Sequence, residues 1–348
     1  MGLTINPLFE LTRGYFDYYL PVMRRCSPKT KDIYRKVINQ LLDHIKGKRG
    51  IRLYDVTIDM INRQSVSEYL TYIETERKCS VKTRNHRLDC IRSFMRYAAD
   101  NDSRAAEMWT DIKYVPKAKV AIEPVEYLSI SQIENIISQP DTSTKMGLRD
   151  SFLMLFMYQT GTRVGELVNI KITDLQIDNP AAVLTVHGKG GKVRKVPMRD
   201  VLVEHLKKYI KRFHGGYKIH DDNYLFYTIH ERTYTRMTED NVRRLVQKYG
   251  SLAKEKDPSI PDSVHPHLFR HSIAMHLYQN GVHLSLISEW LGHTFLETTL
   301  IYAYADTEHK RKAIEKAIPE DSTLKKYTNS ERYIEDDDDM VRRLYGLK

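Results

Sequence analysis

Three stretches in the second half of the chain hold residue types that bind or attack anions. The first, QTGTRVGEL from residue 159 to 167, places a Thr-Gly turn before a predicted helix, with Arg163 in its first turn. Backbone N–H groups at a helix start and a guanidinium beside them form an anion site. An arginine followed by a glutamate at helical spacing, here Glu166, is also typical of a surface ion pair. This stretch alone therefore leaves both interpretations open.

The second stretch is HPHLFRH, residues 265 to 271. On a helix, His267, Arg270 and His271 share one face, so one guanidinium and two imidazoles would point at the same place. A metal site built from His265, His267 and His271 is the alternative, and the lack of a nearby cysteine or carboxylate speaks against it. We interpret His271 and His276 as core residues.

The third stretch is WLGH, residues 290 to 293, followed by TTLIYAYA with Tyr302 nine residues after His293. A tyrosine on a helix is ordinarily a half-buried packing residue. The chain has 23 tyrosines, so a single one identifies nothing. Tyr304 is the main rival of Tyr302 as a nucleophile, but its distance from His293 is two residues longer.

Taken together, these stretches resemble the catalytic domain of the tyrosine recombinases, the family of phage integrases, Xer-type resolvases and transposon recombinases, which shares its chemistry with type IB topoisomerases. The matching pieces are TGTRVGEL, VHGKGGKVRKVP, HPHLFRH, LGH and TTLIYAYA, in the family's order over about residues 125 to 310. Five ordered motifs are far more specific than one. The chain departs from the family at Gly165, where many members have Ser, and at Phe269, where Leu is usual; neither change removes a reacting group.

The resemblance implies a reaction in which a tyrosine hydroxyl attacks a DNA phosphodiester and forms a 3′-phosphotyrosine, without a metal or other cofactor. Two guanidiniums would stabilise the negative charge on the non-bridging oxygens. A phenol has a pKa near 10, so its proton must be removed as it attacks. The implied roles are Tyr302 as nucleophile, Arg163 and Arg270 as phosphate clamps, Lys189 as general acid, His267 on the proton path or at the phosphate, His293 at a non-bridging oxygen, and Glu166 in support.

The composition agrees with a DNA partner. Lys and Arg outnumber Asp and Glu by 55 to 45, and the formal charge of +10 attracts a polyanion such as double-stranded DNA. A solvated basic surface without a partner is the alternative. The three cysteines lack metal-type spacing, and no run of about 18 apolar residues occurs. We expect a soluble, cytoplasmic protein without a membrane segment.

The elements that must position these residues fall into two groups. The first is a predicted helical bundle that resembles the family's core-binding, SAM-like domain. Ser27 and Pro28 begin one helix with an apolar stripe of Ile33, Val37, Leu41 and Ile45, and a second helix runs from Ser80 to near Ala98. Both helices carry basic residues suited to a phosphate backbone. The predicted DNA contacts are Lys31, Arg35, Lys82, Arg84 and Arg87.

The second group of elements predicts a mixed α+β catalytic domain. Together with the helical bundle, it gives the whole chain a predicted fold class that is mainly α with a small antiparallel sheet. A capping box at Ser129 and Gln132 begins a helix, an apolar helix follows at residues 152–158, and strands are expected at 175–177, 183–187 and 193–196. Lys189 lies in the glycine-rich tip between the last two strands. We place the domains at residues 1–114 and 127–318, with a proline-containing linker at 115–126.

Residues 319–348 form a charged tail with eight acidic and six basic side chains. Four of the acidic residues are the consecutive aspartates at 336–339. Such a charge run is typical of a disordered segment. The apolar residues of the tail favour docking on a neighbouring subunit instead: Tyr333, Ile334, Met340, Val341 and Leu344.

The resemblance implies a homotetramer on two synapsed DNA sites. Within that function, the layout favours integration or transposition of a mobile element, with Xer-like resolution of chromosome or plasmid dimers second. A topoisomerase-like relaxing enzyme is a further alternative. A DNA-binding regulator without catalysis is disfavoured because every reacting residue type is present.

Overall fold

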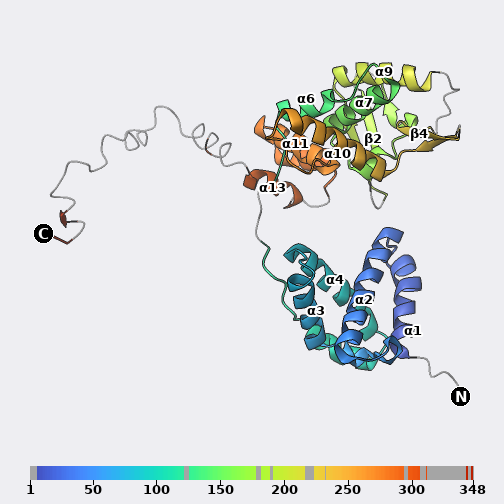
Figure 1. The fold of residues 1–348 in the computed structure, drawn as a ribbon, viewed down its shortest axis with the longest axis vertical. Coiled ribbons are helices and arrows are strands. Elements are labelled where there is room, and N and C mark those ends of the chain that lie inside the picture. Colours follow the sequence, from blue (N-terminus) through green and yellow to red (C-terminus); the bar gives the residue numbers. More distant parts are fainter. Residues whose placement is uncertain are drawn as a thin grey trace. The chain divides into compact units, whose positions relative to one another are not determined.

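The computed structural model describes residues 6–120, 125–177, 182–188, 191–215, 223–231, 233–293, 297–305, 311, 342–343 and 346–347; of residues 230, 297, 304 and 305 it describes only the backbone. The chain divides into two compact units, Met1–Ile122 and Glu123–Lys348. Figure 1 draws the elements of both units as ribbons. Each unit has its own cluster of buried apolar side chains. None of the described helices is long and apolar enough to cross a membrane.

The N-terminal unit is all helical, as the sequence predicts. Its elements are α1 (Pro7–Gly14), the π-helix η1 (Tyr15–Met23), α2 (Pro28–Arg49), the short 3₁₀ helices η2 (Leu53–Asp55) and η3 (Ile58–Met60), α3 (Arg63–Thr75), α4 (Val81–Ala99) and α5 (Ser103–Ile112). The Ser27 and Ser80 hydroxyls cap α2 and α4 by accepting the N–H of the residue three positions on. Both helix starts predicted from the sequence are confirmed.

The predicted apolar stripe of α2 is correct for three of its four residues. Val37, Leu41 and Ile45 are buried, but the side chain of Ile33 is 40% exposed. A strict four-residue spacing drifts by about 40° per step from the 3.6-residue helical turn, so Ile33 lies off the stripe. Tyr34 takes its place, with its ring 6.4 Å from that of Tyr15 on η1.

The segment after α5 packs on the N-terminal unit at its start. Val115 is 2% exposed, and the backbone N–H of Ala118 donates to Asn85 at 3.0 Å. Residues 121–124 lie outside the described part of the chain.

The second unit mixes helices with two small antiparallel sheets. A three-stranded sheet has the order β1-β2-β3, formed by β1 (Leu175–Gln176), β2 (Val183–His187) and β3 (Val193–Pro197). The three strands confirm the predicted ones. A second hairpin, β4 (Tyr227–His230) with β5 (Thr233–Arg236), was not predicted.

The other described elements of this unit are helical. They are α6 (Ile130–Ser138), α7 (Lys145–Thr160), the short α8 (Val164–Leu167), α9 (Asp200–His214), α10 (Glu239–Lys256), α11 (Pro266–Gln279), α12 (Leu284–Leu291) and α13 (Glu297–Ala305), with the 3₁₀ turn η4 (Ile172–Asp174). The capping box of Ser129 and Gln132 is present at α6. The apolar α7 is buried as predicted and packs against α11, α9 and α6. The fold is therefore mainly α with small antiparallel sheets, and the three later helices α11, α12 and α13 pack on one another.

Candidate active site

Arg163 lies at the junction between α7 and α8. Gly161 ends α7 with a φ of +58°, and a Cβ there would lie 2.8 Å from the Trp290 ring, so the turn requires glycine. Arg163 is the residue just before α8 rather than inside its first turn as predicted. Its backbone N–H donates to Glu166 Oε2 at 2.9 Å and its Nη1 to Glu166 Oε1 at 2.9 Å. The pair predicted as a possible surface ion pair is thus half-buried: the Glu166 side chain is 6% exposed and that of Arg163 is 38% exposed.

Arg270 reaches the same place from α11, which begins at Pro266 with His265 as its cap. The side chain is enclosed, with the residue 3% exposed. One nitrogen donates to the Gly161 carbonyl at 2.5 Å and the other to the Leu291 carbonyl at 2.6 Å. These bonds fix the guanidinium between the end of α7 and the end of α12.

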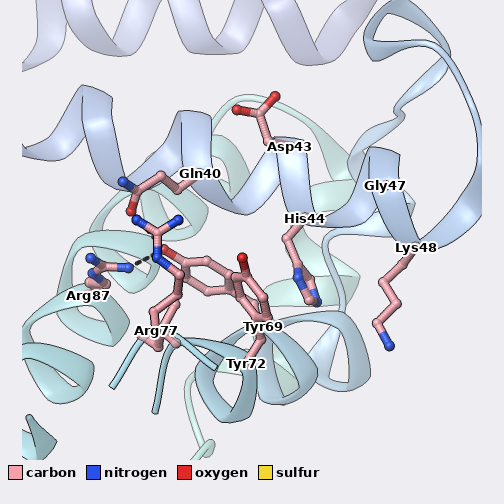
Figure 2. Close-up of a pocket in the computed structure, with 10 residues that line it drawn as sticks. Gln40, Asp43, His44, Gly47, Lys48, Tyr69, Tyr72, Arg77 and Arg87 are labelled. Carbon is pink, nitrogen blue, oxygen red and sulfur yellow. Dashed lines mark hydrogen bonds between the residues drawn. The ribbon is translucent and has the colours of Figure 1, made fainter. Parts of the chain in front are cut away.

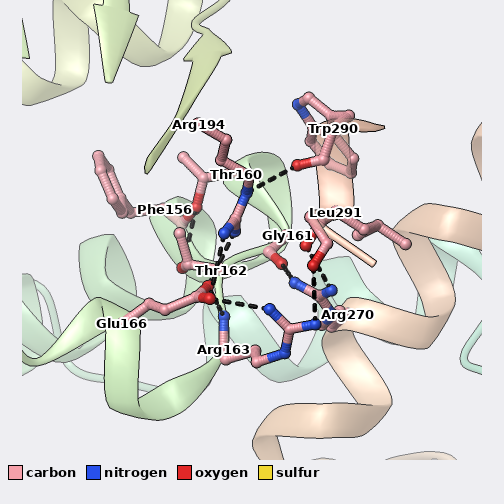
Figure 3. A network of polar contacts seen from close by, with 11 residues as sticks. Phe156, Thr160, Gly161, Thr162, Arg163, Glu166, Arg194, Arg270, Trp290 and Leu291 are labelled. Carbon is pink, nitrogen blue, oxygen red and sulfur yellow. Dashed lines mark hydrogen bonds and ion pairs between the residues drawn. The ribbon is translucent and has the colours of Figure 1, made fainter. Parts of the chain in front are cut away.

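The last carbonyls of α12 bring three arginines together (Figure 3). Trp290 accepts from Arg194 Nε at 2.9 Å, Leu291 from Arg270, and Gly292 from Arg163 at 3.2 Å. Carbonyls at a helix C-terminus lack partners within the helix and carry partial negative charge, so they suit guanidiniums. Three consecutive residues therefore hold cations from β3, α11 and the start of α8 at one point.

The charges in this cluster are unequal. Glu166 also accepts from Arg194, at 2.8 and 3.1 Å. Burial by itself raises the pKa of Glu166, but its bonds to Arg194 and Arg163 lower it to about 2. Burial, together with the charge of Arg163, lowers the pKa of Arg270 to about 9. Three guanidiniums thus meet one carboxylate in the network of Figure 3, and an anion placed there would relieve their repulsion.

The predicted histidines lie around this cluster. His293 follows α12 and its Nδ1 is 2.8 Å from Thr299 Oγ1. Burial, and then Arg270 and Arg163, lower the pKa of His293 to about 4. Desolvation and the Arg270 charge also lower the pKa of His267, on the first turn of α11. Both rings are therefore neutral near pH 7.

Tyr302 on α13 is buried, with 1% of its surface exposed. Its hydroxyl lies 3.0 Å from Nδ1 of His271, and burial raises its pKa to about 12 in spite of the opposing charges of Arg270 and Arg163. The side chain of the rival Tyr304 lies outside the described residues.

Two residues of this neighbourhood were missed by sequence reasoning. His271 was interpreted as a core residue, yet it contacts the hydroxyl of Tyr302; burial lowers its pKa to about 4. Its position one residue after Arg270, on the face shared with His267, was the signal available. Arg194 on β3 was not singled out. His276 is buried as predicted and bonds to the Tyr158 hydroxyl at 2.9 Å.

Lys189 and Gly190 lie outside the described residues. The hairpin on both sides of them is described: β2 and β3 pair in register up to His187 and Val193, and the Gly188 N–H donates to the Lys192 carbonyl at 2.6 Å. The predicted tail is also outside, except for residues 342–343 and 346–347.

The five predicted DNA contacts lie on the helices as expected. Lys82 on α4 is exposed, Lys31 and Arg35 on α2 lie 3.4 Å from Asp17 and Asp32, and Arg84 lies 3.5 Å from Glu74. Arg87 donates to the Tyr69 hydroxyl at 3.1 Å. Figure 2 shows Arg87 and Arg77 on the wall of a cavity of about 420 Å³ between α2 and α3.

Comparison with known proteins decides the family. Residues 126–309 match the phage integrase family and residues 16–105 match the phage integrase N-terminal SAM-like domain. The chain belongs to the phage integrase family. Tyrosine recombinase XerD of Staphylococcus haemolyticus is 31% identical over 82% of this chain and 91% of its own length. The family of tyrosine recombinases cleaves and rejoins DNA at specific sites, and this chain is such an enzyme.

Two solved structures share the fold of this phage integrase family member. XerH recombinase bound to a palindromic difH substrate has a TM-score of 0.67 at 20% identity, with 84% of this chain and 81% of XerH covered. The Tn1549 transposon integrase bound to transposon right end DNA has a TM-score of 0.62 at 19% identity, with 86% and 98% covered.

Proposed function

We propose that this recombinase cuts double-stranded DNA by attack of Tyr302 on a phosphodiester and rejoins it to a second site, integrating or transposing a mobile element. The observation that carries the proposal is the convergence of Arg163 and Arg270 on adjacent carbonyls of one turn, beside the helix of Tyr302. Paired guanidiniums with a surplus of positive charge suit the non-bridging oxygens of a reacting phosphate.

In the proposed step, the Tyr302 oxygen forms a bond to phosphorus and the bond from phosphorus to the 5′-oxygen breaks. The products are a 3′-phosphotyrosine and a free 5′-hydroxyl. No water or nucleotide is consumed, so the 5′-hydroxyl of a partner strand can reverse the step. Because Tyr302 is 1% exposed, its hydroxyl must become accessible before it can attack a phosphodiester.

Two protons must move in this step. His271 is the candidate acceptor of the phenol proton, since its ring is neutral near pH 7 and its Nδ1 lies 3.0 Å from the hydroxyl. Lys189, on the hairpin tip, is the candidate donor to the leaving 5′-oxygen. His293 and His267 complete the contacts to the phosphate, and Glu166 holds Arg163.

The nucleophile is tested with Tyr302→Phe. First, covalent adducts of the wild-type protein are mapped on genomic DNA of its source to define a cleavage site. A nicked duplex with that site then traps the adduct, because the short 5′-hydroxyl fragment diffuses away. We expect Tyr302→Phe to bind this duplex as the wild type does and to form no adduct. Normal adduct formation by Tyr302→Phe would place the nucleophile elsewhere. Tyr304→Phe is the matched control and should still form the adduct.

The roles of proton donor and proton acceptor are distinguished with a duplex whose 5′-bridging oxygen is replaced by sulfur. Sulfur is a leaving group that needs no proton. Lys189→Ala should be slowed strongly on the oxygen substrate and far less on the sulfur substrate. His271→Asn should be slowed similarly on both, because it acts on the attacking side. Equal slowing of Lys189→Ala on both substrates would remove Lys189 from the acid role.

The biological role is proposed from the relatives. The Tn1549 transposon integrase is bound to transposon right end DNA in its structure, which supports a mobile element, whereas the similarity to XerD supports dimer resolution as the second candidate. We propose a homotetramer on two synapsed sites in the cytoplasm. Adducts that map to the ends of one element support the first role, and adducts at a single chromosomal site support the second. Relaxation of supercoiled plasmid without joining of two duplexes would favour a topoisomerase-like activity instead.

A further inference from the structure

Arg194 occupies an inward position on β3, five residues after Lys189. It pairs with Val186 of β2 in the sheet register, and the side chains on either side of it along the strand, Val193 and Lys195, are exposed. The Arg194 side chain is 11% exposed and its partner carboxylate on Glu166 is 6% exposed. The strand therefore turns a charged residue toward the interior, which requires a specific set of partners.

Those partners belong to two other parts of the candidate site. Two nitrogens of Arg194 bind both oxygens of Glu166, at 2.8 and 3.1 Å, and the third donates to the Trp290 carbonyl at 2.9 Å. Gly292 makes room for the arginine, since a Cβ at this position would lie 2.9 Å from Cδ of Arg194. Arg194 thus joins the hairpin strand to α8 and to the end of α12.

We propose that Arg194 is a positioning residue that holds Glu166 ionised and thereby orients Arg163 for the phosphate. The inference rests on the proposed function. Glu166 uses one oxygen for Arg163 Nη1 and the other for its backbone N–H, while Arg194 donates to both oxygens. Without Arg194, the buried carboxylate loses two charged hydrogen bonds and becomes easier to protonate. A protonated Glu166 accepts fewer bonds and no longer attracts the guanidinium of Arg163.

The ladder of the hairpin continues one residue pair beyond Arg194. The ladder between β2 and β3 runs up to His187 and Val193, directly before Arg194, so the loop with Lys189 starts from a strand that is tied to Glu166.

The test compares Arg194→Gln and Arg194→Lys with Lys195→Gln, the exposed neighbour on the same strand. Single-turnover cleavage of the nicked duplex is measured from pH 5 to 8.5, with DNA affinity and thermal melting alongside. We expect Arg194→Gln to cleave at least about tenfold more slowly at pH 7 with DNA affinity within about threefold of wild type. Its activity should also fall on the acidic side at a higher pH than in the wild type. Lys195→Gln should match the wild type.

A merely structural role would lower the rate by the same factor at every pH, and that result would overturn the proposal. A second criterion is the double variant Arg194→Gln with Glu166→Gln. If Arg194 acts through Glu166, the double variant cleaves no more slowly than Glu166→Gln alone, whereas multiplied losses would show an independent role. Should Arg194→Gln fail to fold, Arg194→Lys decides: it keeps the charge but not the paired geometry, so we expect a smaller rate loss with little shift in the acidic limb.

A failure of the role proposed for Arg194 can be distinguished from a failure of the proposed function. If the wild type forms its adduct at Tyr302 and Arg194→Gln is as fast as wild type at every pH, only the role of Arg194 fails. If no adduct forms at Tyr302, the proposed function itself fails.

Discussion

In the N-terminal unit the predicted DNA-binding cations are mostly exposed or partly exposed, with Arg84, at 14% side-chain exposure, as the exception, whereas in the catalytic unit Arg194 and Arg270 are enclosed. Arg35, for example, lies 3.4 Å from Asp32 with much of both side chains exposed, while Arg270 bonds to two backbone carbonyls inside the fold. Exposed pairs contribute about 0.2–1 kcal/mol, but removing one partner of a buried pair costs about 3–5 kcal/mol. The exposed cations of the first unit are thus suited to adding affinity for DNA, and the buried arginines of the second unit to fixing the geometry of the candidate active site.

The largest expected effect is that of Glu166→Gln. The substitution leaves Arg163 and Arg194 without their shared negative charge, so we expect the catalytic unit to lose on the order of 3 kcal/mol of stability. We also expect cleavage to fall by about 10²–10³. Single-turnover cleavage and thermal melting measure the two effects.

Asp240→Asn is the matched control, because it removes an exposed carboxylate that pairs with Arg244 on α10. It should change stability by less than about 1 kcal/mol. Equal effects of the two substitutions would abolish the distinction between buried and exposed charge in this protein.

Acid should affect the two units differently. Burial and nearby cations lower the pKa of His271 and His293 from 6.5 to about 4. Between these values the unfolded chain binds protons that the folded unit does not, so the free energy of unfolding falls as the pH drops from 6.5 to 4, by at least about 1 kcal/mol. The contribution of Glu166, whose pKa falls from 4.5 to about 2, is lost only at still lower pH.

The two tryptophans allow each unit to be followed alone. Trp109 lies on α5 of the N-terminal unit and Trp290 on α12 of the catalytic unit. In Trp109→Phe, the fluorescence of Trp290 should report a melting temperature that decreases between pH 6.5 and 4. In Trp290→Phe, Trp109 should report a smaller decrease, because His44 is the described histidine of that unit with a lowered pKa. Parallel decreases would contradict the comparison.

The smallest expected effect comes from the surface cations. Lys82→Gln and Arg87→Gln should each weaken DNA binding a few-fold and reduce the slope of log K against log salt by about 0.9. Cleavage at saturating DNA should stay unchanged. Arg52→Gln, which removes a cation outside the predicted contacts, is the control. A loss of cleavage rate at saturation would show that the N-terminal cations also shape the reaction.

Local elements were predictable because their signals are local. The capping hydroxyls of Ser27, Ser80 and Ser129 satisfy the first N–H groups of their own helices, which a sequence of a few residues determines. The strands beside the glycine-rich tip were found for the same reason. The exposure of Ile33 was not predictable from its spacing, since Tyr34 packs on η1 from a different part of the chain.

The sequence alone determined the capped helix starts at Ser27, Ser80 and Ser129 and the two strands of the hairpin, because each depends on neighbours within a turn or two. It also determined the order of the reacting residue types. Only the tertiary structure decided that Glu166 is buried between Arg163 and Arg194, and that His271 contacts Tyr302. These contacts join residues up to 31 positions apart, and longer ones join Arg163 to Gly292. Burial raises the cost of an unpaired charge, so the roles of these residues follow from which partners the packing supplies.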